Sequence, residues 1–212
     1  MVLEYSKRNW WLIRHAPVLS PTICGQSDLA ADMSDRARLQ ALASLLPDGA
    51  EVFSSDLLRC RETAREIFSH RDGHADTPTL LASLREQDFG DWEGRSHADV
   101  EREDPAGYRA FWENPAENRP AGGESFSQLV ARVHPQIDAL WQAATADNII
   151  IVAHAGTIRA IVGLALGLTV DKMLALSVAP LSLTSLSSYR KGDDAGSWQV
   201  NYINDQGAAL HR

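Results

Sequence analysis

Two histidines follow apolar runs of the kind that form buried strands. His15 comes directly after Arg14 and the run 10–13, and His154 follows residues 148–153 (NIIIVA). In open α/β sheets, ligands bind beyond the carboxyl ends of the strands, so we expect both imidazoles at one edge of a sheet. A neutral imidazole is a nucleophile at neutral pH and can carry a phosphoryl group. The pattern therefore indicates covalent phosphoryl transfer.

Arginines and a glutamate are predicted at the same edge. Arg59 and Arg61 lie one turn into a helix expected over 56–68, and Glu86 follows a strand expected around 79–85. A planar, permanently charged guanidinium suits the oxygens of a phosphoryl group. A carboxylic acid can protonate the departing alkoxide and then deprotonate water. Taken singly, each of these residues could have a purely structural role. Their shared location at one edge of the predicted sheet is what favours a functional site.

Composition argues against several other functions. The 212 residues include 20 Lys and Arg against 28 Asp and Glu, a formal net charge of −8. We therefore expect no binding to nucleic acid or to an anionic membrane, because no surplus cation exists to replace counterions. Cys24 and Cys60 are too few for a disulfide framework, so we expect free thiols in the cytoplasm. The sequence has no metal-ligand motif or Walker loop, and we predict neither a metal nor a cofactor.

The elements that must position these residues alternate between strands and helices. We expect strands at 9–15, 51–55, 79–85, 148–153, 181–190 and 197–204, the last two joined by turn residues Gly192 to Gly196. We expect helices at 34–46, 56–68, 124–146 and 157–166. Pro135 lies inside the third helix and should kink or divide it. The alternation predicts the α/β class, as a three-layer αβα sandwich with a mostly parallel central sheet.

Residues 1–212 are expected to form a single domain with a lid or insertion at about 87–123. A long connection of this kind is more often functional than part of the core. It contains nine acidic residues and four arginines, a net charge of −5. Its aromatic side chains could stack on a ring-containing leaving group or form a minor core under the lid.

Five sequence blocks occur in an order that resembles the histidine phosphatase superfamily, whose fold is phosphoglycerate mutase-like. The blocks are WLIRHAPV, SSDLLRCRETA, LREQDFGDWEG, PAGGES and IVAHAGTIRAIV, and the resemblance spans most of the chain. It implies that His15 is the phospho-accepting nucleophile and that Glu86 is the proton donor. It also implies that Arg14, Arg59 and His154 form the phosphate pocket.

The chain departs from the family pattern within and after the first block. Ala16 replaces the usual glycine, a change of little cost unless the backbone needs a positive φ. The family's asparagine contact to phosphate is absent, and Ser20, Thr22 or Ser27 could take its place. Residues 23–29 (ICGQSDL) resemble the corresponding segment of bacterial α-ribazole phosphatases, although its tyrosine is absent.

The residues and the resemblance together predict a metal-independent phosphatase that hydrolyses a small phosphorylated metabolite through a phosphohistidine on His15. One alternative is phosphoglycerate mutase-like phosphoryl transfer, and another is a catalytically silent phosphate-binding module. A mutase must hold a second phosphate and a carboxylate, which calls for extra cations, whereas the stretch 87–123 is acidic. A binding module needs no proton donor, so Glu86 argues for an enzyme.

Overall fold

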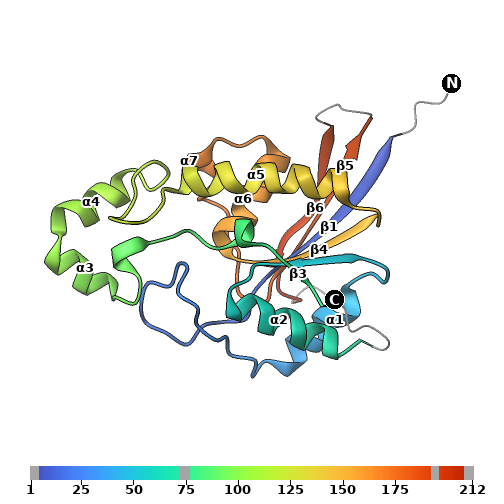
Figure 1. Cartoon of the computed structure of the whole chain (residues 1–212), viewed down its shortest axis with the longest axis horizontal. Coiled ribbons are helices and arrows are strands. Elements are labelled where there is room, and N and C mark those ends of the chain that lie inside the picture. The colour runs from blue at the N-terminus through green and yellow to red at the C-terminus, as the bar shows by residue number, and fades with distance from the viewer. Residues whose placement is uncertain (1–4, 72–76, 192–195, 208–212) are drawn as a thin grey trace.

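The computed structural model describes residues 5–71, 77–191 and 196–207, and Figure 1 shows their arrangement. The strands are β1 (Ser6–Arg14), β2 (Glu51–Ser54), β3 (Thr79–Leu80), β4 (Asn148–Ala153), β5 (Leu183–Arg190) and β6 (Ser197–Asp205). The α-helices are α1 (Arg36–Leu45), α2 (Leu58–Ser69), α3 (His97–Glu103), α4 (Pro105–Glu113), α5 (Phe126–Ala143), α6 (Ala155–Leu166) and α7 (Val170–Met173). Two 3-10 helices, η1 (Ala82–Leu84) and η2 (Gly90–Trp92), lie between β3 and α3.

The strands form one sheet in the order β3-β2-β4-β1-β5-β6. The first four are mutually parallel, whereas β5 and β6 are antiparallel to their neighbours. The register places Arg14 opposite Ala153 and Ser54 opposite Val152, so the three central parallel strands end at nearly the same level. Residues that follow these strands are therefore brought to one edge.

Helices cover both faces of this sheet (Figure 1). Along β4, Ile149 and Ile151 point into the core shared with α5 and α6, whereas Ile150 and Val152 point into the core shared with α1 and α2. Burial on both faces explains why this strand has a continuous apolar sequence. The predicted α/β sandwich with a mostly parallel sheet is confirmed.

The strand expected at 79–85 is much shorter in the structure. β3 pairs with β2 only through Thr79 and Leu80, because β2 itself ends at Ser54, opposite Leu80. Beyond that point the chain has no strand to extend along and forms η1, whose Leu84 is fully buried. The prediction is therefore wrong beyond the second residue of the strand.

Of the two effects expected of Pro135, a kink or a division of the segment 124–146, the division is wrong, because α5 is one continuous helix. A proline removes one intrahelical donor. Val133 and Ile137, on either side of it, are fully buried in the core, and their packing compensates for the lost hydrogen bond. A capping box at Ser125 also stabilises the first turn.

The two C-terminal strands form the predicted antiparallel pair. Residues 192–195 of the predicted turn lie outside the described residues. Gly196 has a φ of 77°, in the left-handed region that glycine adopts without strain.

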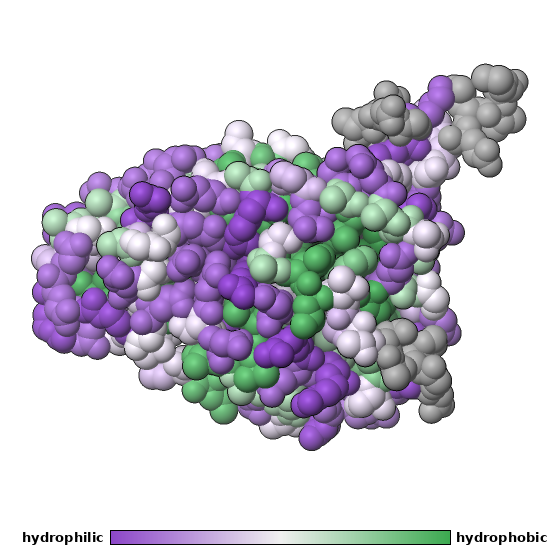
Figure 2. Space-filling view, viewed as in Figure 1, coloured by the Kyte–Doolittle hydropathy of each residue, from purple (hydrophilic) through white to green (hydrophobic). Residues whose placement is uncertain are grey.

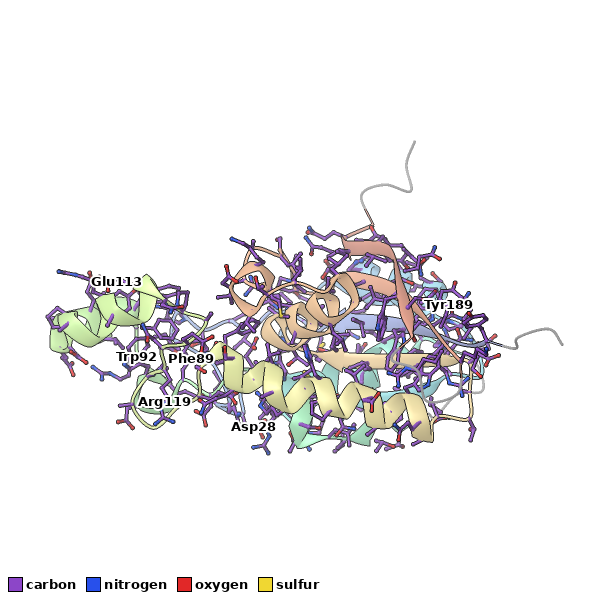
Figure 3. The ribbon with its side chains drawn as sticks, turned by 90° about the horizontal axis from the view of Figure 1, so that it is seen from above. Asp28, Phe89, Trp92, Glu113, Arg119 and Tyr189 are labelled. Atoms are coloured by element: carbon purple, nitrogen blue, oxygen red, sulfur yellow. The ribbon has the colours of Figure 1, made fainter. Side chains whose placement is uncertain are left out.

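Residues 87–123, called the arm below, extend from the sheet beyond the start of α5 (Figures 1 and 3). The arm contains η2, α3 and α4. Trp92, Val100 and Phe111 form a small core with Ile23 from the loop after β1. Trp92 is 6% and Phe111 is 4% exposed, so these two rings belong to the minor core that the sequence allowed.

Figure 2 shows a mostly hydrophilic surface over the arm and over the outer face of α5. Leu80, in the edge strand β3, is among the exposed apolar residues. Within the described ranges, no helix is long and apolar enough to cross a membrane.

Candidate active site

His15 and His154 lie side by side because the strands that precede them are neighbours. Arg14 of β1 pairs with Ala153 of β4, and the next residue in each segment is a histidine. The backbone N–H of His15 donates to the carbonyl of Ala153 at 3.0 Å, which extends the ladder by one step. The two ring centroids are 5.0 Å apart in an edge-to-face arrangement. The structure thus brings together the two imidazoles that the sequence places at strand ends.

The ring of His15 is held with one nitrogen available. Its Nδ1 lies 2.7 Å from the carbonyl oxygen of Ala16. Because a carbonyl can only accept, Nδ1 carries the proton and Nε2 keeps its lone pair. Burial lowers the pKa of His15 to about 3, and the charges of Arg59 and Arg14 contribute to this shift. The imidazole is therefore neutral at pH 7, as a nucleophile must be.

Two guanidinium groups are fixed near this ring by backbone carbonyls. Arg59, from α2, is 1% exposed, and it donates from Nη1 to Ser27 at 2.8 Å and from Nη2 to Gly25 at 2.6 Å. Arg14 donates from Nη1 to the carbonyl of Val178 at 2.6 Å, and its buried Nε has no partner among the described residues. A buried donor without a partner suits an incoming anion.

His154 precedes α6 and is completely buried. Its Nδ1 accepts from Nε of Arg59 at 3.2 Å, and its Nε2 lies 2.8 Å from the hydroxyl of Ser55. The thiol of Cys60 lies 3.3 Å from the same Nε2. Burial lowers the pKa of His154 well below its ordinary range, and His15 and Arg59 lower it further. Since protein groups contact both ring nitrogens, a phosphate contact requires one of these bonds to be exchanged.

Glu86 lies in the loop between η1 and η2. Its carboxylate accepts from the backbone N–H of Gly156 at 3.1 Å and from that of Gln87 at 3.0 Å. Gly156 is the second residue of α6, so the carboxylate stands at the positive end of the helix dipole. A Cβ on Gly156 would lie 2.2 Å from Oε1 of Glu86 and would displace the carboxylate. The charge of Glu86 also raises the pKa of Arg14 against the lowering by burial.

Arg59 and Arg61 are separated by their positions on α2. Residues two apart on a helix differ by about 200° in direction and so face opposite sides. Arg59 is buried, whereas the side chain of Arg61 is 42% exposed and forms an ion pair with Asp28 at 3.7 Å. The predicted cluster therefore includes only the first of these arginines.

Ser20, Thr22 and Ser27 were the candidates to replace the missing asparagine. Their hydroxyl groups all form hydrogen bonds to other side chains of the protein. The Ser27 hydroxyl donates to the carboxylate of Glu93 at 2.5 Å. The hydroxyls of Ser20 and Thr22 lie 2.7 Å from each other. Ala16 is not among the described residues with positive φ, so alanine is accommodated there at the low cost expected.

Two residues that the sequence does not single out contact the backbone that leads to Glu86. Arg132 of α5 donates to the carbonyl of Glu86 at 2.8 Å, and Thr157 of α6 donates to the carbonyl of Arg85 at 2.9 Å. Thr157 lies three residues after His154, so its sequence position already indicated that it would lie close to the site. Arg132 is 46 residues away from Glu86 in sequence, and no local pattern marks it.

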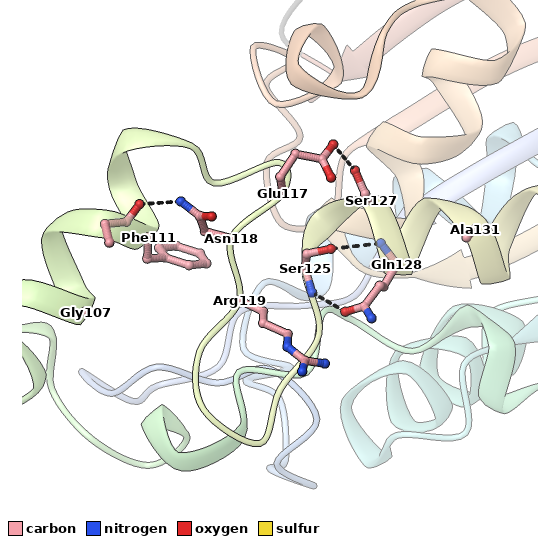
Figure 4. A pocket seen from close by; sticks show the side chains of 10 residues that line it. Gly107, Phe111, Glu117, Asn118, Arg119, Ser125, Ser127, Gln128 and Ala131 are labelled. Atoms are coloured by element: carbon pink, nitrogen blue, oxygen red, sulfur yellow. Dashed lines mark hydrogen bonds between the residues drawn. The ribbon is translucent and has the colours of Figure 1, made fainter.

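A groove of about 680 Å³ lies between α4 and the first turns of α5, outside this cluster (Figure 4). Glu117 accepts from Ser127 there at 2.6 Å, and Ser125 and Gln128 cap α5. None of the predicted site residues lines the groove. The part of the chain that the structure describes has no group of three or more His, Cys, Asp or Glu side chains suited to a metal ion.

Phosphoryl transfer through histidine is the chemistry that these groups have in common. It needs an uncharged imidazole nucleophile, fixed cations for the oxygens of the phosphoryl group and a proton donor for the leaving group. The fold and the cluster therefore define a class of α/β phosphoryl-transfer enzymes with the site at the carboxyl ends of parallel strands.

Comparison with known proteins narrows this class to one family. Residues 10–205 match the histidine phosphatase superfamily (branch 1), and the chain belongs to that superfamily. It is 33% identical over 202 residues to glucosyl-3-phosphoglycerate phosphatase from Mycolicibacterium vanbaalenii, covering 84% of this chain and 86% of the relative. It is 31% identical over 180 residues to adenosylcobalamin/α-ribazole phosphatase from Salmonella typhi, covering 81% and 82%.

Solved structures agree with this assignment. The α-ribazole phosphatase from Shigella flexneri is 25% identical and superposes with a TM-score of 0.81, covering 96% of this chain and 100% of that one. The predicted family, fold and enzyme class are confirmed, and the chain is a phosphatase of this superfamily.

Proposed function

We propose that the chain hydrolyses a small phosphomonoester in two steps and without a metal ion, with His15 as the covalent carrier and Glu86 as acid and base. The observation that carries this proposal is the state of the His15 ring. The ring is neutral, its Nδ1 is committed to the carbonyl of Ala16, and no hydrogen bond within the described residues occupies its Nε2.

In the first step, Nε2 of His15 attacks the phosphorus and the bond between phosphorus and the ester oxygen breaks. Glu86, as a carboxylic acid, gives its proton to the departing oxygen, so that an alcohol leaves and a carboxylate remains. In the second step, this carboxylate takes a proton from water while the water oxygen attacks the phosphorus. The phosphorus–nitrogen bond breaks, which releases inorganic phosphate and restores neutral His15.

Arg14 and Arg59 are the proposed ligands of the peripheral phosphoryl oxygens. The contribution of both guanidinium charges to the lowered pKa of His15 and the deep burial of Arg59 support this role. His154 would complete the pocket by redirecting its Nε2–H from Ser55 toward a phosphoryl oxygen. Such fixed donors stabilise the charge that spreads over these oxygens in the transition state.

The proposed substrate is a small phosphorylated metabolite of the cytoplasm. The relatives named above act, by their names, on glucosyl-3-phosphoglycerate and on α-ribazole compounds, which supports an ester of this size. Free Cys24 and Cys60 support a reducing compartment. The net charge of −5 on the arm favours hydrolysis over a mutase, which must hold a second phosphate.

A panel of phosphorylated metabolites assayed with excess EDTA tests this function. We expect inorganic phosphate to be released from at least one member, at a rate that EDTA leaves unchanged. The panel includes glucosyl-3-phosphoglycerate, α-ribazole 5′-phosphate and the phosphoglycerates. Transfer of the phosphoryl group between positions without its release would identify a mutase, and the absence of both reactions would identify a binding module.

Changing Arg59 to lysine is expected to lower kcat/KM by about 10²-fold, the usual effect of losing one preorganised electrostatic donor. A lysine ammonium is a point charge and cannot replace a guanidinium held by Ser27, Gly25 and His154. Steady-state kinetics with the best substrate of the panel provides the measurement.

The matched control for this change is Arg61→Lys, on the exposed side of the same helix. We expect this variant to retain the activity of the unaltered protein. Equal activity in Arg59→Lys and Arg61→Lys would show that Arg59 does not contact the phosphoryl group.

A further inference from the structure

We propose that Arg132 is a positioning residue, which places the carboxyl group of Glu86 by clamping the backbone on which it stands. This inference rests on the proposed function, because it concerns the same proton donor. It assigns a role in the reaction to a side chain on α5 that does not itself reach the His15 ring through any described hydrogen bond.

The guanidinium of Arg132 binds three backbone carbonyls within the four-residue stretch 83–86. Its Nη1 donates to the carbonyls of Ser83 at 2.9 Å and Arg85 at 2.8 Å, and its Nη2 donates to the carbonyl of Glu86 at 2.8 Å. These carbonyls belong to the end of η1 and to the loop that follows it. A loop would otherwise be among the more mobile parts of the molecule. The fork of a single arginine therefore fixes the main chain of the proton donor.

Glu124 holds the guanidinium itself in place. Its carboxylate accepts from Nε of Arg132 at 3.1 Å and from Nη2 at 2.6 Å. The side chains are only 23% and 17% exposed, so the pair is largely removed from water. Loss of one member of such a pair leaves the other uncompensated. Because the carboxylate of Glu124 binds both Nε and Nη2, it also orients the guanidinium of Arg132, so that the remaining N–H groups point at the backbone carbonyls.

The same glutamate joins both ends of the arm. Its Oε1 accepts from the backbone N–H of Asp88 at 3.1 Å, and its own N–H donates to the carbonyl of Asp88 at 2.9 Å. Gln87 adds a bond from its side-chain amide to the carbonyl of Glu124 at 2.9 Å. The clamp therefore connects the base of the arm to the residue that carries the proton.

The backbone and the carboxylate of Glu86 are anchored to different helices. Arg132 on α5 holds the backbone, whereas the N–H of Gly156 on α6 holds the carboxylate. Thr157, also on α6, supports the neighbouring carbonyl of Arg85. A displacement of about 1 Å at a catalytic group can cost 10²-fold in rate. Relaxing the clamp on α5 should therefore impair proton donation by Glu86.

The test is Arg132→Lys, because an ammonium keeps the charge toward Glu124 but cannot reach three carbonyls and a carboxylate together. Its kcat/KM is measured with glycerol 2-phosphate, whose alkoxide needs a proton, and with 4-nitrophenyl phosphate, whose phenolate leaves without one. We expect the alkyl ester to lose about tenfold or more beyond the loss for the nitrophenyl ester. A clamp with a purely structural role would lower both values by the same factor.

Arg95→Lys is the matched control. Arg95 also pairs with a glutamate, Glu103, at 2.5 Å, but it lies in the arm and makes no described contact with residues 83–86. We expect equal kcat/KM values for this variant and the unaltered protein with both esters. Thermal unfolding of each variant is recorded alongside. Should Arg132→Lys fail to fold, Glu124→Gln weakens the same clamp and should give the same contrast between the two esters.

A double variant separates this inference from the proposed function. If Arg132 acts through Glu86, adding Arg132→Lys to Glu86→Gln should cause no further loss with the alkyl ester. Two results would overturn the role of Arg132 without affecting Glu86. In one, the factors lost by the two single variants multiply in the double variant; in the other, Arg132→Lys loses the same factor with both esters. An equal loss of burst rate for both esters in Glu86→Gln would instead overturn Glu86 as the proton donor, and with it that part of the proposed function.

Discussion

Changing His15 to alanine is expected to abolish both hydrolysis and covalent labelling. The imidazole supplies the nucleophilic Nε2, and alanine leaves no atom that can accept the phosphoryl group. Incubation with a ³²P-labelled substrate followed by rapid alkaline quenching measures the intermediate directly. The label on the unaltered protein should be stable in base and labile in acid, as a phosphorus–nitrogen bond is. Peptide mapping should place it on His15.

The second histidine provides the control for this assignment. His154 lies 5.0 Å from His15 between ring centroids, and burial keeps both rings neutral, so charge alone does not distinguish the two. Within the described residues, His154 has side-chain partners at both ring nitrogens, whereas the ring of His15 has one partner, the carbonyl of Ala16. We therefore expect His154→Ala to turn over slowly but still to label His15. Label on His154 in the unaltered protein would contradict the assignment of the nucleophile.

The neutral state of His15 has its own signature in the pH dependence. Because the pKa of His15 is lowered to about 3 from an ordinary 6.5, its ring should show no protonation by NMR between pH 5 and pH 8. The unfolded chain would bind a proton at this residue below about pH 6.5 that the folded chain does not bind. Stability should therefore fall as the pH decreases from 6.5 toward 3. A ring that titrates near pH 6.5 would contradict the buried geometry.

The central strands were predictable because their sequence has a strong physical signal. Residues 149–153 are apolar without interruption since both faces of β4 are covered, and the histidine that follows must then stand at the sheet edge. The end of β3 had no such signal, because its length depends on where its partner β2 stops. The failure of Pro135 to divide α5 has a related reason: the packing of the residues around it outweighs the loss of one hydrogen-bond donor.

Site residues that directly follow a strand of the sheet could be predicted from the sequence, whereas those placed by helix orientation or tertiary packing could not. Arg14 and His15 follow from the end of β1 alone. The choice between Arg59 and Arg61 depends on the phase of α2, which the sequence pattern leaves open and the family resemblance supplies. Arg132 depends on how α5 lies against the loop of Glu86, a tertiary relation with no trace in local sequence.

Changing Glu86 to glutamine is expected to lower kcat/KM for alkyl phosphates by about 10²- to 10⁴-fold, the usual contribution of general acid catalysis. Glutamine keeps the size of the side chain and can still accept from the N–H groups of Gly156 and Gln87, but it has no proton to give. An alkoxide is a strong base and leaves slowly without a proton, whereas 4-nitrophenolate is weakly basic and leaves readily. The loss should therefore be far smaller with 4-nitrophenyl phosphate.

The two roles of Glu86 require that the first step be measured by itself. The same carboxylate activates water in the second step, so turnover of 4-nitrophenyl phosphate by Glu86→Gln should stop after a burst. The burst rate reports phosphorylation of His15 alone, and it should be nearly normal for the nitrophenyl ester. Glu101→Gln, at an exposed position on the arm, serves as the control and should behave like the unaltered protein. Equal losses in burst rate for both esters would mean that Glu86 only shapes the site. Asp88 would then be the next acid to test, since Glu124 is committed to its ion pair with Arg132.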